Sequence, residues 1–249
     1  MEKLNLSNVV YSRRDIEKGI VIPEVLTPKL SEDIGIHLGD GSLYLAGSCK
    51  TFEFIYSGHI DEKSHMTHIM NLKRELYNIQ KGTLRQKGNE LRLRIYSFAL
   101  ANFYTKVIGL PIGTKKDICV PNIIMVSNNK EIIAGFLRGL IDTDFSLIIR
   151  KRSNGPYPSL QGDFSSKNLI IDLQKLFIKL NIQNSILLDI KRYDKRSSKT
   201  YISHTISIHG FKRVTKWLEI IGYNNKKKFK KKVGLAGFEP STSGWLRYS

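Results

Sequence analysis

The sequence has few cysteines and no long apolar segment. Its two cysteines, Cys49 and Cys119, lack the CxxC or Cys/His spacing that would hold zinc, and a chain of 249 residues does not need a disulfide to fold. No apolar run approaches the length of a membrane-spanning helix, and the first residues, MEKLNLSNVVYSRRD, lack the apolar core of a signal peptide. We therefore expect no membrane association and an intracellular protein, in the cytoplasm, the nucleoid or an organelle matrix.

Acidic residues are also scarce. The chain has 40 Lys and Arg against 22 Asp and Glu, which gives a formal charge of +18 and a pI near 9.8. Seven Lys or Arg and one Glu follow Asn225, so +6 belongs to the tail and +12 remains on residues 1–225. Because the excess is spread over the folded part, it predicts a surface that follows the phosphates of a nucleic acid.

The chain contains a repeat. Residues 93–109, LRIYSFALANFYTKVIG, and residues 206–222, ISIHGFKRVTKWLEIIG, share an alternating stretch, then apolar positions at helical spacing, then a glycine. Each segment predicts a strand followed by a helix, and several matches at one offset argue against coincidence. The matched pairs, 113 residues apart, are Ile95 and Ile208, Phe98 and Phe211, Ala101 and Val214, Tyr104 and Trp217, and Ile108 and Ile221.

Upstream patterns extend each copy to seven elements. HMTHIMNLKRELYNI and KNLIIDLQKLFIKLNI predict amphipathic helices, and an alternating strand pattern precedes each of them. Each copy reads helix, strand, strand, helix, strand, strand, helix, which predicts an α+β fold of two αββαββα repeats. The predicted parts are a lead-in over 1–30, a first repeat over 31–112, a linker over 113–130, a second repeat over 131–224 and a basic, flexible tail over 225–249.

Two segments place an acidic residue after small residues spaced four apart. When IGIHLGDG is aligned with LRGLIDTDF, Asp40 meets Asp144 at an offset of 104. Residues four apart share a helix face, and small side chains there let a second backbone approach closely. Two such helices packed at these faces would bring the two carboxylates together at one end of the contact. The residues predicted to form this contact are Gly35, Gly39, Gly139 and Thr143.

A carboxylate pair at two helix C-termini favours a metal site. The helix dipoles are negative at those ends, so the pair is repulsive unless cations neutralise it, and carboxylate oxygens suit Mg²⁺. A metal held there can activate a water molecule for hydrolysis of a phosphodiester bond. The twofold repeat provides the geometry for cutting both strands of a duplex. A lone Asp40 or Asp144 would more often be a turn residue or helix cap, but the repeated position favours the metal site.

The two motifs resemble a known family. IGIHLGDGSLY and FLRGLIDTDFSLI are similar to the two signature helices of single-chain LAGLIDADG homing endonucleases, and GLPIGTKKDICVPNII resembles the linker often seen before the second motif. The resemblance implies a pseudo-twofold fold whose two sheets form a saddle over double-stranded DNA. It also implies a monomer that makes Mg²⁺-dependent double-strand breaks at a long target site, for the homing of an intron or mobile element. Mn²⁺ would substitute for Mg²⁺. The metal-site residues implied are the catalytic Asp40 and Asp144, with Gly39 and Thr143 beside them.

The second motif departs from the family at one position. Phe145 stands where the family usually has glycine, and a Phe forced to positive φ there would cost roughly 1 kcal/mol or more. The resemblance also implies a basic residue near each metal, usually from a late strand. Arg94 is the candidate in the first repeat, with Ser207 at the same place in the second, and Lys167 and Lys212 are the alternatives.

Strand alternation predicts which side chains contact DNA. Residues at even steps past each catalytic Asp share one face of the sheet, while Leu43 and Leu45 turn inward. Such a face can contact base edges and phosphates, although a solvated surface is the alternative for any single residue. The predicted DNA-contacting residues are Ser42, Tyr44, Ala46, Ser48, Lys50, Glu53, Arg92 and Arg94 in the first repeat, and Ser146, Ile148, Arg150, Arg152, Ser159, Gln161 and Asp163 in the second.

A second function fits the same fold. Some proteins of this family keep the fold but use it to bind intron RNA as maturases. The acid pair favours the nuclease, and Phe145 favours the maturase mildly.

Overall fold

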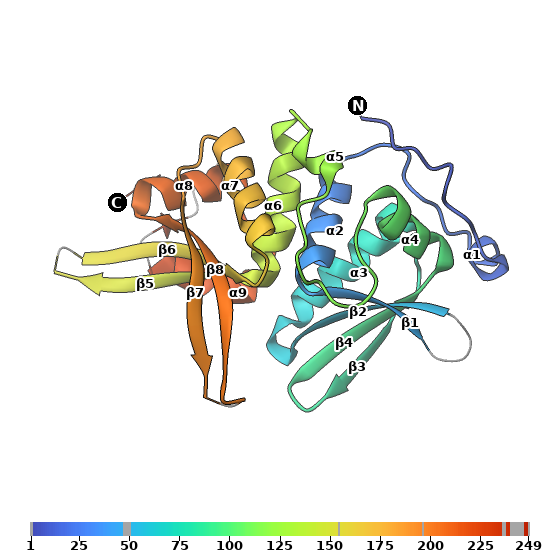
Figure 1. Cartoon of the computed structure of the whole chain (residues 1–249), viewed down its shortest axis with the longest axis horizontal. Coiled ribbons are helices and arrows are strands. Elements are labelled where there is room, and N and C mark those ends of the chain that lie inside the picture. Colours follow the sequence, from blue (N-terminus) through green and yellow to red (C-terminus); the bar gives the residue numbers. More distant parts are fainter. Residues whose placement is uncertain are drawn as a thin grey trace. The chain divides into compact units, whose positions relative to one another are not determined.

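The structure, a computed structural model, describes residues 2–46, 51–153, 155–195, 197–235, 238–239 and 247–248. The chain divides into two compact units (Figure 1). The first unit comprises Met1–Lys115, Pro121–Thr143 and Asn224–Lys227, and the second comprises Lys116–Val120, Asp144–Tyr223 and Lys228–Ser249. No helix among the described residues is long and apolar enough to cross a bilayer.

The first unit is built on one antiparallel sheet and its covering helices. Its strands are β1 (Gly41–Ala46), β2 (Thr51–His59), β3 (Thr83–Lys87) and β4 (Glu90–Tyr96), in the order β1-β2-β4-β3. Its helices are α1 (Arg13–Glu17), α2 (Pro28–Gly39), α3 (Lys63–Tyr77), α4 (Phe98–Asn102), α5 (Asn122–Met125) and α6 (Lys130–Asp144), the last of which ends in the second unit. A 3₁₀ turn, Ile60–Glu62, precedes α3, and a π-helical turn, Phe103–Val107, follows α4.

Alternation along the strands decides which face of this sheet is buried. Phe54, Leu93 and Ile95 lie on the face that α3 and α4 cover, and each is almost completely buried. Thr27 and Ser97 start α2 and α4 by accepting hydrogen bonds from backbone N–H groups three residues on, as N-cap residues do. The helices are therefore fixed both by capping and by apolar packing.

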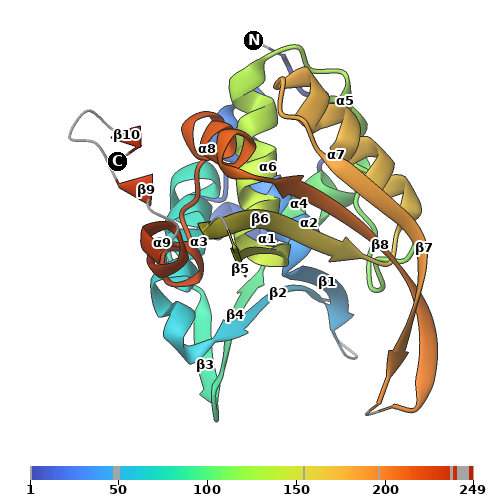
Figure 2. The same ribbon diagram turned by 90° about the vertical axis from the view of Figure 1, so that its left-hand side faces the viewer.

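The second unit repeats this plan. Its strands are β5 (Phe145–Arg152), β6 (Gly155–Phe164), β7 (Ser185–Asp194) and β8 (Lys199–His209), in the order β5-β6-β8-β7. Its helices are α7 (Lys167–Lys179) and α8 (Phe211–Ile220), and β7 and β8 remain paired beyond the end of β6 (Figure 2). Because both sheets have the same strand order and both are antiparallel, the predicted α+β fold of two αββαββα repeats is confirmed.

The matched positions of the repeat have matching surroundings, with one exception. Tyr104 and Trp217 are both fully buried, and so are, within a few per cent, the Ile95, Ala101 and Ile108 pairs. The fifth pair is not buried, since Phe98 is 37% exposed and Phe211 is partly exposed. The shared pattern is therefore a core pattern at four of its five pairs.

The basic tail begins with structure rather than as a flexible end. Residues 226–235 form helix α9 (Lys226–Leu235), and Phe229 is fully buried against Trp217 and Tyr223 in the second unit. The lysine run predicted a solvated segment, but the single Phe within it provides an apolar anchor. Two short strands, β9 (Phe238–Glu239) and β10 (Arg247–Tyr248), pair further along.

Candidate nucleic-acid interface

The two signature segments form α2 and α6, which lie side by side within the first unit (Figure 1). Their backbones touch at glycines. A Cβ on Gly35 would lie 2.1 Å from the carbonyl oxygen of Phe136, and a Cβ on Gly139 would lie 2.1 Å from that of Glu32. Real Cβ atoms do not approach backbone so closely, so only glycine fits at either position.

The contact is longer than the sequence predicted, and it runs parallel. A Cβ on Gly135 would lie 2.3 Å from the carbonyl oxygen of Pro28, and the Ser31 hydroxyl donates to the carbonyl of Ile132 at 2.6 Å. Gly135 faces Pro28 while Gly139 faces Glu32, so residue numbers rise in the same direction on both helices. The C-terminal ends of α2 and α6 therefore lie at the same end of the contact.

A Gly139→Ala variant tests how close this contact is. In an exposed helix this change stabilises by about 1 kcal/mol, because Ala is the better helix former. At Gly139 the new methyl group meets backbone, so we expect the variant to be less stable by about 1–3 kcal/mol. Gly234→Ala is the matched control, because a Cβ at that helical glycine has nothing within 4 Å. Urea unfolding should give opposite signs for the two variants, and equal effects would contradict the close contact.

Asp40 and Asp144 stand at the ends of these helices. Asp40 is the residue that follows α2 directly, with φ −80° and ψ −10°, and its N–H donates to the carbonyl of Ile36. Asp144 is the last residue of α6 and is exposed. Asp40 belongs to the first unit and Asp144 begins the second. Each aspartate is thus placed at a helix C-terminus, where the partial charge of the helix dipole is negative.

The predicted neighbours of the two aspartates have other partners in the structure. The Gly39 carbonyl oxygen accepts a hydrogen bond from Lys115 at 2.7 Å. Thr143 is buried, and its hydroxyl donates to the carbonyl of Leu140 in its own helix at 2.8 Å. Neither interaction removes the oxygen lone pairs that a cation would need, because an accepting carbonyl or a hydroxyl keeps a further lone pair.

Lys115 caps the C-terminus of α2. Its Nζ atom donates to the carbonyl oxygens of His37, Leu38 and Gly39 at 2.8, 2.7 and 2.7 Å. Four carbonyls at a helix C-terminus lack partners within the helix, and a cation there offsets the negative end of the dipole. This role could not be predicted, because the lysine lies in the linker and its partners are backbone atoms.

Removing this cation should loosen the end of α2. We expect Lys115→Met to lower the free energy of unfolding by about 1–2 kcal/mol, because charge-assisted hydrogen bonds and a favourable dipole interaction are lost. Lys116→Met is the matched control, because Lys116 is the next residue and is exposed, and it should change stability by less than about 0.5 kcal/mol. Chemical denaturation of both variants measures the difference, and equal stabilities would contradict the capping role.

A polar network holds residues 224–225 against both helices. The Asn224 N–H donates to Asp142 at 2.8 Å, its side-chain amide donates to Glu32 at 2.7 Å, and the Asn225 amide donates to the carbonyl of Asp142 at 3.2 Å. Burial raises the pKa of Asp142 to about 7, and the two asparagine N–H groups partly oppose this. Glu32 is also bridged by His68 at 2.6 Å and Arg138 at 3.1 Å.

The register of the first sheet gathers the predicted side chains on one face. Residues directly opposite each other in an antiparallel pair point to the same side. Tyr44 is opposite Glu53, and Glu53 is opposite Tyr96, while Arg94 is opposite Ile55. We call this side the first outer face, and it includes Ser42, Tyr44, Ala46, Glu53, Ser57, Thr83, Arg85, Lys87, Arg92, Arg94 and Tyr96.

Two details of this face differ from the prediction. Leu45 lies on the opposite side of the sheet but is 50% exposed, because it stands near the end of β1. Ser48 and Lys50, predicted to contact DNA, lie outside the described residues. Glu53 is nearly buried, since Arg94 bridges it at 3.2 Å and the Tyr96 hydroxyl donates to it at 2.7 Å.

The second sheet has an equivalent face. Ser146 is opposite Gln161 and Ile148 is opposite Ser159, while Asp163 is bridged by Arg192 at 2.6 Å. Arg152 ends β5 opposite Gly155, and its side chain lies outside the described part. The polar residues of β8 and Arg192 were missed by sequence reasoning. The second outer face includes Ser146, Ile148, Arg150, Tyr157, Ser159, Gln161, Asp163, Ser185, Arg192, Ser203, Thr205, Ser207 and His209.

The basic candidates occupy different surroundings. Arg94 lies on the first outer face, bound to Glu53. Lys167 is the first residue of α7 and bridges Asp189 at 2.7 Å, and Lys212 lies on α8. Arg94 is thus the candidate on an outer face, while Lys167 and Lys212 stand on covering helices.

Phe145 does not have the strained backbone that the family comparison suggested. It begins β5, opposite Gly162, and neither Phe145 nor Gly41 has positive φ. Its ring is fully buried and contacts Phe164 and Phe177, and a Cβ on Gly162 would lie 2.8 Å from it. The helix therefore runs into the strand without a glycine, and Phe145 fills the core of the second unit.

Comparisons with known proteins agree with this plan. The family model of the LAGLIDADG-like domain matches residues 131–234. No curated protein sequence matches the chain. The match to the family model confirms the resemblance noted in the motifs for the second repeat.

Solved structures share the fold over most of the chain. A mesophilic variant of the homing endonuclease I-DmoI matches with a TM-score of 0.53 and 18% identity over 78% of this chain and 95% of that one. I-DmoI in complex with DNA and calcium matches with a TM-score of 0.53, 17% identity and coverages of 78% and 88%. The LAGLIDADG homing endonuclease I-GzeII in complex with its DNA target matches with a TM-score of 0.53, 12% identity and coverages of 84% and 88%.

Proposed function

We propose that this protein is a homing endonuclease that cuts both strands of DNA with divalent cations held by Asp40 and Asp144. The observation that carries the proposal is the parallel contact of α2 and α6 at glycines, which places the C-termini of both helices at the same end of the contact. Asp40 directly follows α2, and Asp144 is the last residue of α6. The family match and the likeness to endonucleases solved with DNA support it.

The residues present fit a divalent cation. Carboxylates are hard oxygen donors, which Mg²⁺ and Mn²⁺ prefer, and Asp40 is half-buried while Asp144 is exposed. The C-terminal ends of α2 and α6 add negative potential beside them. When bound, such a cation lowers the pKa of water and offsets charge that develops on the phosphate. Related proteins have been solved with DNA and calcium or manganese.

The chain's own residues would position the substrate. The first outer face carries Arg85, Lys87, Arg92 and Arg94, and the second carries Arg150 and Arg192 among hydroxyl and amide groups. Guanidinium groups can bind phosphates or guanine edges, and Ser146 and Gln161, which are at least partly exposed, can bind base edges. Ser159 and the Ser and Thr residues of β8 on this face are buried. We propose that both outer faces contact the duplex, with the two repeats of one monomer addressing one half of the target each.

A cleavage assay with matched metal conditions tests the proposal. The protein is incubated with a plasmid library of candidate insertion sites, with Mg²⁺, with Mn²⁺ and with EDTA. We expect linear product with either metal and none with EDTA. Absence of cutting in every metal, together with tight binding and splicing of an intron RNA, would show that the chain is an RNA maturase instead.

A further inference from the structure

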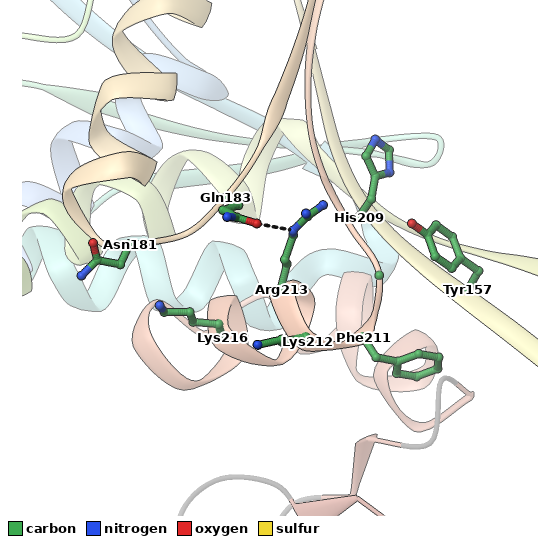
Figure 3. A pocket seen from close by; sticks show the side chains of 9 residues that line it. Tyr157, Asn181, Gln183, His209, Phe211, Lys212, Arg213 and Lys216 are labelled. Atoms are coloured by element: carbon green, nitrogen blue, oxygen red, sulfur yellow. Dashed lines mark hydrogen bonds between the residues drawn. The ribbon is translucent and has the colours of Figure 1, made fainter.

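A cavity of about 590 Å³ lies within the second unit, and neither Asp40 nor Asp144 lines it (Figure 3). It opens where the end of β8, the start of α8 and the turn after α7 meet. Of the described residues that line it, none is acidic. They are Tyr157, Asn181, Gln183, His209, Gly210, Phe211, Lys212, Arg213 and Lys216.

The cavity is strongly cationic. Lys212, Arg213 and Lys216 come from the first two turns of α8, and the Arg213 Nε atom donates to Gln183 at 3.0 Å (Figure 3). The residue before α8 is Gly210, with φ 82°, which has no side chain to cap the helix. Three cations and the positive end of a helix dipole therefore face one hollow.

The first repeat shows what fills the equivalent place there. A smaller cavity of about 280 Å³ in the first unit is lined by Asn78, Gln80 and Tyr96, which correspond to Asn181, Gln183 and His209. Asn78 and Asn181 even share left-handed backbone, with φ 56° and 58°. The lead-in covers this place, because Lys18 and Ile20 line the cavity and the Gly19 carbonyl accepts from Asn78 at 2.9 Å.

The lead-in also brings a carboxylate to the helix. Asp15 is 1% exposed, and it accepts a hydrogen bond at 3.1 Å from the N–H of Ala99 in the first turn of α4. The helix that corresponds to α8 therefore has a buried anion at its N-terminus, supplied from within the chain. Around that anion the first repeat has buried Ala99, Leu100 and Phe103, where the second repeat has Lys212, Arg213 and Lys216.

We infer that the cavity of the second repeat binds a backbone phosphate of the DNA duplex. In the first repeat the helix N-terminus takes a carboxylate, whereas Gly210 offers α8 no capping side chain, and three cations replace three apolar residues beside it. The cavity also adjoins the second outer face, because Tyr157 is opposite Arg150 and His209 is opposite Ser159. The inference rests on the proposed DNA binding and extends the footprint past the edge of the sheet.

The salt dependence of binding tests this inference. Binding of a 40-base-pair duplex of arbitrary sequence is measured in EDTA over a range of NaCl concentrations. Each phosphate contact contributes about 0.9 to the slope of log affinity against log salt. We expect Lys212→Gln/Lys216→Gln to reduce that slope by about 1 and to weaken binding roughly tenfold at 0.1 M salt. Lys212→Arg/Lys216→Arg should keep the wild-type slope.

A charge-matched control separates this site from a general loss of charge. Lys130→Gln/Lys175→Gln removes the same charge from exposed positions on α6 and α7 that do not line the cavity, and its slope should stay at the wild-type value. Equal slopes for the two Gln variants would overturn the inference. The inference would also be overturned if the cavity bound only free phosphate. In that case low-millimolar inorganic phosphate would stabilise the wild type but not Lys212→Gln/Lys216→Gln, and both proteins would have the same salt dependence of DNA binding. If DNA is bound with the expected slopes but is never cut with Mg²⁺, the proposed nuclease activity is wrong, while the phosphate site is supported.

Discussion

Asp40→Asn is expected to reduce the rate constant of DNA cleavage on the order of 1,000-fold while changing duplex affinity by less than about threefold. Asp144→Asn should do the same. Asparagine keeps the shape of the side chain but lacks the charge that holds a divalent cation, so chemistry is lost while the sheet faces still bind. Single-turnover cleavage at saturating protein measures the first quantity, and binding to the same target in EDTA measures the second.

The control for these variants is an aspartate with no proposed role. Asp117 lies in the linker with φ 53°, a conformation that asparagine tolerates well, so Asp117→Asn should cleave at the wild-type rate. Either catalytic variant cutting both strands at full rate would refute the assigned role of its carboxylate. A variant that leaves a nick in one strand would support one carboxylate acting mainly on each strand.

The sequence predicted the parts of the fold that depend on periodicity. Gly35 and Gly139 were recognisable because small residues spaced four apart are the direct requirement of two close backbones. The outer faces were predictable because strand side chains alternate and the repeat provided the register twice. The fold of two repeats followed because seven elements recur in the same order.

Features that depend on single long-range contacts were not predictable. Lys115 recognises backbone carbonyls, which leave no mark in the sequence. Asn224 was assigned to the end of the second repeat and Asn225 to the tail, although both hold Asp142 through hydrogen bonds across more than 80 residues. Phe145 was judged by the glycine it replaces, whereas its ring packs into an aromatic core that the strand pattern alone does not reveal.

A buried ion pair inside the first unit gives the second large expected effect. Lys73 and Asp33 are both fully buried, with 2.7 Å between the Lys73 Nζ atom and an Asp33 carboxylate oxygen. Tyr77 donates to Asp33 at 2.7 Å, Tyr104 also donates to it, and three tyrosine rings lie about 5 Å from the ammonium group. Burial lowers the pKa of Lys73 below its usual value, and the charge of Asp33 opposes that change. The lysine lies in a segment that was predicted as an amphipathic helix, and that pattern gave no sign of its buried partner.

Lys73→Met should lower the free energy of unfolding by about 3–5 kcal/mol, because Asp33 is left as a buried charge without its cation. The double variant Lys73→Met/Asp33→Leu removes both charges and should recover at least about 1 kcal/mol of that loss, since a buried pair contributes less than the cost of breaking it. Urea unfolding of the wild type, the single variant and the double variant measures both effects. Lys81→Met, at an exposed position, should stay within about 0.5 kcal/mol of the wild type. If the double variant is less stable than Lys73→Met, the loss in the single variant does not come from an uncompensated charge on Asp33.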